Sequence, residues 1–282
     1  MFDNIFAAIE KWMRELLTGM VESNMSTMFT DVNEKTSEIA AQVGRTPQNW
    51  NSSVFSMIQN LSESVVVPIA GIIITLVLCY ELISMLTERN NLHDVDTWMF
   101  FKYFVKAWVA IYLVSNTFTI TMAVFDVGQS VVNSASGIIN GETAIDVSSL
   151  SMQMQAAMAT MEIGELVVLA LETFLVSFCM KIMSVVITVI VYGRMIEIYL
   201  YTSLAPIPFA TMSNREWGHI GTNYFRGLFA LAFQAFLMMV CVAIYAALIS
   251  SVRISSNMHS ALIGVAAYTA VSYTHLTLPT IR

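Results

Sequence analysis

The sequence predicts an all-α, polytopic transmembrane protein with an N-terminal amphipathic helical region. Hydrophobic residues make up 56% of the 282 residues and charged residues only 12%, which is more apolar surface than one soluble core can hide. Several apolar runs also reach the roughly 20 residues that a helix needs to cross a hydrocarbon layer of about 30 Å. The net charge of -7 argues against a basic surface for nucleic acid.

Residues 1–64 form the amphipathic region. Apolar side chains recur at helical spacing from Phe2 to Met20, and most charged side chains fall on the opposite side. This helix carries too many charges to span, so it lies at the membrane interface or packs on a partner. A weaker apolar stripe continues to Val43, and a short helix around Val54 leads into the first span. We therefore expect interfacial or extracytoplasmic helices over residues 1–64.

Residues 65–270 form the predicted transmembrane helical domain. Five apolar runs of this region are each interpreted as one span, at residues 65–86, 103–125, 166–192, 195–212 and 225–250. A sixth span begins at Ala261 and is truncated. The three cysteines lie inside such runs without ligand spacing, so they are expected to be small buried side chains.

Residues 271–282, with the sequence VSYTHLTLPTIR, interrupt the sixth apolar run soon after it begins. They resemble translated sequencing adapter. We therefore expect a non-native tail here and a native protein that continues its sixth helix beyond about residue 270.

Loop charge predicts the orientation, because Lys and Arg are retained on the cytoplasmic side. The connection after the first span holds Arg89 and Lys102, whereas residues 126–162 contain no Lys or Arg and four carboxylates. Residues 87–102 are therefore predicted to be cytoplasmic and residues 126–162 external. The N-terminal region is then external too, although it carries four cations of its own, and a segment of that length obeys the charge rule poorly.

Ionisable residues inside the apolar runs are the candidate conduit or interhelix polar residues. Glu165 and Glu172 are seven residues apart and share a helix face, whereas Lys181 lies nine residues further on, nearly opposite. Each needs a partner on another helix, on another subunit or in water, and an interhelix pair, an aqueous conduit and a proton relay all remain open. Arg194 and Glu197 are three residues apart and can pair locally.

Pro206 and Pro208 mark a candidate hinge. Each proline removes a backbone hydrogen bond and clashes with the preceding turn, so the short run around them is kinked or broken. Broken helices at membrane depth are tolerated where they pack in protein or line a cavity. A hinge, a re-entrant hairpin and a kink with only packing consequences are all compatible with the sequence.

No enzyme is indicated. A phosphate-binding Walker loop, an HExxH zinc motif and a GxSxG nucleophile motif are all missing from the sequence. His93 stands beside Asp94 and Asp96, but two Asp ahead of a helix favour helix capping over a metal site. We assign no catalytic, cofactor-binding or metal-binding residue and expect no cofactor, so energy-dependent transport would need a separate motor.

Several strings carry a family resemblance: NLHD at 91–94, SNTF at 115–118, GRMIE at 193–197, APIP at 205–208 and VCVAIY at 240–245. With Trp98, Phe101 and Lys102, this pattern resembles TrbL-like conjugal transfer proteins of Gram-positive mobile elements, over about residues 1 to 270. The resemblance implies a multi-pass subunit of a type IV secretion system in the bacterial cytoplasmic membrane. It places the chain in the channel that passes a relaxase-bound DNA strand, and it carries over no catalytic residue.

The expected partners are membrane lipid, other type IV secretion subunits including ATPases, further copies of the chain and a translocated nucleoprotein. Two other classes stay open. A secondary transporter often shows two related halves with paired broken helices, but the sequence has one evident broken segment and no repeat. A non-transporting membrane scaffold or a lysis-type protein is compatible with the same apolar spans.

Overall fold

The computed structural model describes residues 2–87, 97–139, 147–250 and 258–277. Within these ranges the chain is helical apart from short turns and contains no strand, which confirms the predicted all-α class. Four helical stretches of the described chain are long and apolar enough to cross a membrane, namely Ser52–Thr87, Thr97–Ser115, Ile163–Leu204 and Gly218–Leu248. The polytopic helical character is thereby confirmed.

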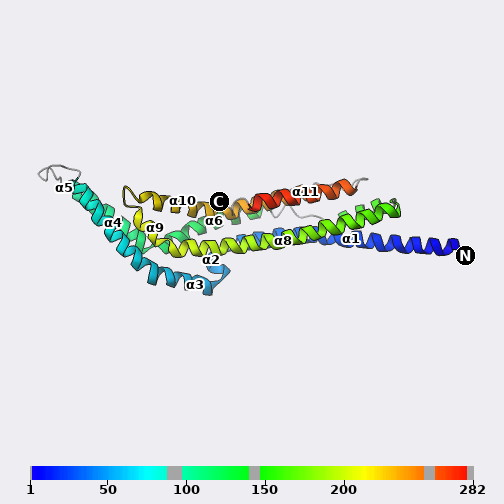
Figure 1. The fold of residues 1–282 in the computed structure, drawn as a ribbon, viewed down its shortest axis with the longest axis horizontal. Coiled ribbons are helices and arrows are strands. Elements are labelled where there is room, and N and C mark those ends of the chain that lie inside the picture. Colours follow the sequence, from blue (N-terminus) through cyan, green and yellow to red (C-terminus); the bar gives the residue numbers. More distant parts are fainter. Residues whose placement is uncertain (1, 88–96, 140–146, 251–257, 278–282) are drawn as a thin grey trace. The chain divides into compact units, whose positions relative to one another are not determined.

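Figure 1 labels the helices along the ribbon. The helices and one π-helical segment follow the order α1 (Phe2–Val43), α2 (Pro47–Trp50), α3 (Ser52–Leu61), η1 (Ser62–Val66), α4 (Val67–Thr87), α5 (Thr97–Ser115), α6 (Thr117–Ile139), α7 (Val147–Met158), α8 (Ile163–Leu204), α9 (Pro206–Thr211), α10 (Gly218–Ser250) and α11 (Met258–Thr277). The chain forms two compact units: unit 1 comprises residues 1–44, 132–192 and 236–282, and unit 2 comprises residues 45–131 and 193–235.

The core of unit 1 is rich in methionine. It joins the second half of α1 to α7, to the first part of α8 and to α11, through Val21, Met25, Met28, Phe29, Val32, Met154, Met158, Leu166, Leu169, Ala170, Met180, Leu262 and Val265. Methionine is unbranched and flexible, so it fills irregular gaps between helices. The weaker apolar stripe that the sequence places after Met20 is therefore a core stripe.

The N-terminal half of α1 differs, because its apolar stripe is exposed. Phe2, Phe6 and Trp12 expose 77%, 68% and 60% of their surface. Arg14 fixes the helix to unit 1 by donating a 2.7 Å hydrogen bond to the carbonyl of Met161. The two surfaces predicted for this stripe, a membrane interface and a partner protein, both remain predictions.

Unit 2 is built around α9. Phe209 and Ala210 of α9 are buried against Ala70 and Ile74 of α4 and against α5. A second cluster packs α6, the end of α8 and α10 together, through Phe125, Met195, Ile198, Leu228, Leu231 and Ala232. Buried Tyr199 of α8 donates a 2.6 Å hydrogen bond to the carbonyl of Pro47 and so attaches α2 to this cluster.

The spans differ from the expected ones in two places. The predicted run 103–125 is divided at Asn116, so α5 ends at Ser115 and α6 begins at Thr117. The predicted runs 166–192 and 195–212 are not separate, because α8 continues through Gly193 and Arg194 to Leu204. A single glycine within a helix costs only about 1 kcal/mol and does not end it. The 42 residues of α8 give it a length of about 63 Å, roughly twice the hydrocarbon thickness.

The cysteines were expected to be buried, and this is wrong for two of them. Cys79 and Cys179 are exposed, and Cys241 is partly exposed. Each lies on a long apolar helix, and the faces that carry Cys79 and Cys179 are not covered by other described helices of the same chain. The predicted boundaries at residues 64 and 270 separate the amphipathic region, the transmembrane domain and the non-native tail. They depend on where the membrane lies and where the native chain ends, so they stay predictions.

Candidate functional site

Glu165 and Glu172 have different surroundings despite sharing a helix face. Glu165 is exposed in the first turn of α8 and its carboxylate accepts a 3.3 Å hydrogen bond from the backbone N–H of Glu162. This is the position at which a carboxylate stabilises the positive end of a helix. Glu165 is thus a helix-capping residue in this structure.

Glu172 has a partner on another helix of unit 1. Its Oε2 lies 2.6 Å from Nδ1 of His259 on α11, and both side chains are about one-third exposed. A charged residue in an apolar helix is tolerated when it pairs in this way. The sequence indicated that Glu172 needs a partner, but it gave no sign that His259, 87 positions away, would be that partner.

Lys181 lies near the middle of α8 and is exposed. It forms no hydrogen bond or ion pair with any residue in the described ranges. Its stripe on the helix, which includes Phe174, Phe178 and Val185 at positions -7, -3 and +4, is also exposed. Lys181 therefore remains an ionisable group on an apolar, uncovered face.

Arg194 and Glu197 do not form the close ion pair that their spacing suggested, although the negative charge of Glu197 still favours the charged form of Arg194. Arg194 is buried, with 6% of its surface exposed, and its Nε has no hydrogen-bond partner within the described chain. Glu197 is exposed, and no ion pair within 4.0 Å joins the two described side chains. The last part of α8 turns Arg194 into unit 2 and Glu197 outward.

The prolines mark a real break. Helix α8 ends at Leu204 and Pro206 is the first residue of α9, a position where the missing N–H of proline costs nothing. Pro206 is buried, and α9 packs against α4 and α5. The structure therefore confirms a broken helix, and its action as a hinge stays a prediction.

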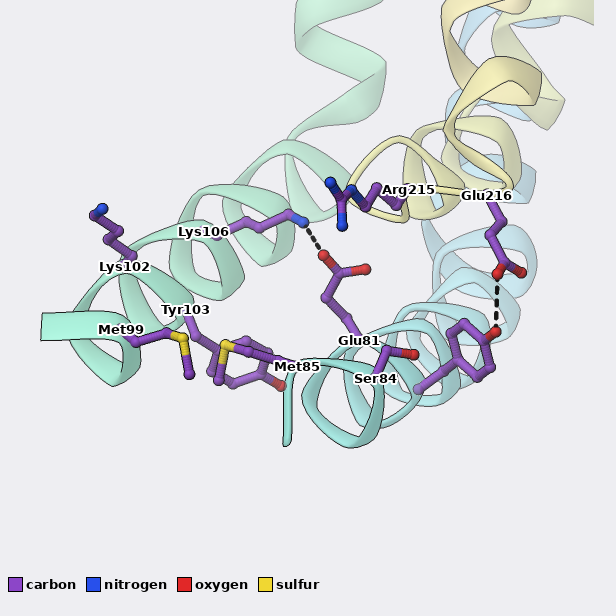
Figure 2. A pocket seen from close by; sticks show the side chains of 10 residues that line it. Glu81, Ser84, Met85, Met99, Lys102, Tyr103, Lys106, Arg215 and Glu216 are labelled. Carbon is purple, nitrogen blue, oxygen red and sulfur yellow. Dashed lines mark hydrogen bonds and ion pairs between the residues drawn. The ribbon is translucent and has the colours of Figure 1, made fainter. Parts of the chain in front are cut away.

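A polar pocket lies in unit 2 where the end of α4, the beginning of α5 and the α9–α10 connection meet (Figure 2). Its volume is about 330 Å³, and its lining comprises Tyr80, Glu81, Ser84, Met85, Met99, Lys102, Tyr103, Lys106, Arg215 and Glu216. Five of these ten residues carry charge. In the sequence, Lys102 contributes to the loop charge and to the family resemblance, and no sequence pattern predicts this pocket.

Specific contacts hold the pocket wall. Lys106 of α5 forms an ion pair with Glu81 of α4, and Figure 2 shows the two side chains pointing toward each other. The hydroxyl of Tyr103 donates a 2.9 Å hydrogen bond to the carbonyl of Leu78. The Glu81–Lys106 pair places two ionisable groups of adjacent spans in contact, so neither faces lipid alone.

Metal-ligating side chains do not gather within the described ranges: no group of three or more His, Cys, Asp or Glu there is arranged to hold an ion. The segment with His93, Asp94 and Asp96 lies outside the described residues. The structure thus leaves the choice between helix capping and metal binding at that segment as the sequence left it.

Comparison with known proteins decides the family. A family model described as TrbL/VirB6 plasmid conjugal transfer like protein matches residues 32–206, more than half of the chain. The chain belongs to this family. No curated protein and no solved structure matches it. The TrbL/VirB6 match runs from the core half of α1 to the break at Pro206, and it confirms the resemblance found in the sequence. As a TrbL/VirB6 protein, the chain is a subunit of a conjugal transfer, or type IV secretion, apparatus.

Proposed function

We propose that this TrbL/VirB6 protein is an oligomeric channel subunit in the bacterial cytoplasmic membrane that assists the passage of relaxase-bound single-stranded DNA. It is not an enzyme, and ATPases in other chains supply the energy. Its partners are those ATPases, other secretion subunits, membrane lipid, the transferred nucleoprotein and further copies of itself. The family match and the four long apolar helices support a membrane role in conjugal transfer.

The single observation that carries the channel role is that Lys181 has no partner within the described chain. A lysine at the centre of a membrane-spanning helix costs about 2.5–3.5 kcal/mol on insertion scales when no partner compensates it. Lys181 has no partner within the described chain, and the α8 stripe around it is exposed. The free-energy cost of placing Lys181 in the membrane falls if this stripe faces water in a conduit or a polar group of a neighbouring subunit. Glu172, which lies on the other side of α8, already has His259.

The test is a pair of substitutions at this position. Lys181→Leu should leave the amount of protein in the membrane unchanged and reduce the size of the detergent-extracted complex, because a loss of about 1.4 kcal/mol weakens subunit association about tenfold. Transfer should fall with the loss of assembled complex. Lys181→Arg keeps the charge and should be milder. Size-exclusion chromatography and mating frequency are the measurements.

Lys11→Leu is the matched control, because Lys11 is an exposed lysine on α1 whose ion-pair partner within the described residues is Glu15, at 3.9 Å. It should transfer normally. If Lys181→Leu and Glu172→Leu both leave complex size and transfer unchanged, these residues are incidental and the proposed mechanism is wrong.

A further inference from the structure

Within unit 1, helix α1 runs beside the first part of α8 and in the same direction (Figure 1). The hydrogen bond donated by Arg14 spans 147 positions, and Asn24 donates a 3.4 Å hydrogen bond to Thr173, 149 positions away. Further along, Glu38 borders the same small cleft as Thr188, which lies 150 positions later. Because this separation is nearly constant, each position of α1 lies at the level of the α8 position about 150 residues further on.

The part of α8 beside α1 is apolar enough to span a membrane. Residues 173–192 contain one charged residue, Lys181, and belong to one of the candidate spanning helices. A helix of that length measures about 30 Å, which is the thickness of the hydrocarbon layer. When α8 spans, residues 24–42 of α1 therefore lie at membrane depth.

The matching stretch of α1 is too polar to face lipid. Residues 24–42 contain three carboxylates and one cation, namely Asp31, Glu34, Glu38 and Lys35. A charged group that faces lipid is costly, so such groups in membrane proteins face the interior of the helix bundle or a water-filled cavity.

The outer face of this stretch does not face the interior of its own chain. Thr30, Glu34 and Ser37 are four and three residues apart and therefore form one stripe, here called the polar stripe of α1. All three side chains are exposed, whereas Met28 and Val32 on the other side of the helix are buried in the methionine-rich core. No other described helix of the chain covers the polar stripe.

We infer that the polar stripe of α1 lines a water-filled passage in the assembled complex. This inference deepens the channel role proposed above and rests on it. The sequence alone places residues 1–64 at the interface or outside the membrane, because they are too polar to span by themselves, and it is the packing on α8 that brings part of α1 to membrane depth. With three carboxylates and one lysine, this part of the wall is acidic. It repels the phosphates of a passing strand and does not hold the strand in place.

The experiment is thiol labelling of single-cysteine variants in isolated membranes, starting from a cysteine-free parent that transfers normally. A charged methanethiosulfonate reagent, which does not enter lipid, should label Thr30→Cys and Ser37→Cys, because a thiol reacts as its thiolate and the thiolate forms in water. The controls are Met28→Cys in the core of unit 1 and Ile72→Cys on the exposed apolar face of α4. Both should react at least about tenfold more slowly. Labelling of Thr30→Cys before mating should lower the mating frequency.

The acidic character of the wall is tested with Glu34→Gln in the Thr30→Cys protein. A cationic reagent should react faster than an anionic one, relative to their rates with a free thiol in solution, and Glu34→Gln should lower this ratio about threefold. Glu10→Gln is the matched control, because Glu10 is an exposed glutamate of α1 outside the stretch beside α8. It should leave the ratio unchanged.

Three results would overturn the inference. Absence of labelling at both Thr30→Cys and Ser37→Cys would mean that lipid or closely packed protein covers the stripe. Labelling that leaves mating unaffected would show a wet surface outside the passage, and a ratio that Glu34→Gln leaves unchanged would show that the stripe does not form the wall around the thiol. Failure of the channel role is a different result, because transfer would then stay normal after deletion of the whole chain.

Discussion

In-frame deletion of this chain should abolish conjugative transfer of the element that encodes it, while solute uptake and cell integrity stay unchanged. The TrbL/VirB6 match places the chain in the transfer apparatus, and the channel role proposed above makes a subunit with four such long apolar helices indispensable. Mating frequency, uptake of labelled solutes and release of a cytoplasmic enzyme are measured in parallel.

Expression of the chain from a second plasmid should restore transfer, which controls for effects on neighbouring genes. The same three assays separate the alternative functions. Lost uptake with normal mating would indicate a secondary transporter, and altered lysis with normal mating would indicate a lysis-type protein. Either outcome contradicts the channel proposal.

Gly128→Ala should destabilise unit 2 strongly. A methyl group built on Gly128 of α6 would lie 2.7 Å from the carbonyl oxygen and 3.1 Å from the carbonyl carbon of Ala232 on α10. Those atoms belong to the backbone of a helix, so no rotamer change relieves the contact. Forced separation of two packed helices costs about 1–3 kcal/mol, and small residues are what allow such close approach in membranes.

Gly71→Ala is the matched control for Gly128→Ala. Gly71 is also inside a helix, but a methyl group there meets nothing within 4 Å. Since alanine is favoured over glycine in a helix by roughly 0.5–1 kcal/mol, Gly71→Ala should stabilise the protein slightly. Thermal unfolding in detergent, followed by size-exclusion chromatography, should therefore move in opposite directions for the two variants. Equal unfolding midpoints would show that the α6–α10 approach is not tight.

The sequence predicted the helical class because hydropathy and helical spacing are local signals. The apolar run ending at Leu86 follows from local hydropathy, and the helix break before Pro206 follows from proline itself. Both features appear in the structure. The continuity of α8 through Gly193 was not predicted, because a glycine beside a charged Arg194 resembles a loop in sequence. Arg194 is instead buried in unit 2, so the helix continues where a loop was expected. This burial depends on tertiary packing, which the local sequence does not show.

The site was less predictable than the fold for the same reason. The need of Glu172 for a partner followed from the cost of a charge in an apolar helix, but the identity of His259 required the packing of α11 on α8. The pocket joins Glu81, Lys106 and Arg215 from three separate parts of the chain. A sequence signal existed only for the first two, as isolated ionisable residues near the ends of adjacent apolar runs.

The central claim is that the Lys181 stripe of α8 faces other subunits or the transported strand and does not face lipid. A photoreactive amino acid at Val185, exposed on that stripe, tests it during active transfer, with Ile72 of α4 as an equally exposed control. We expect Val185 to capture a second copy of the chain, another secretion subunit or the transferred DNA strand, and Ile72 to capture lipid. Lipid adducts alone at Val185, in cells that transfer normally, would contradict the claim.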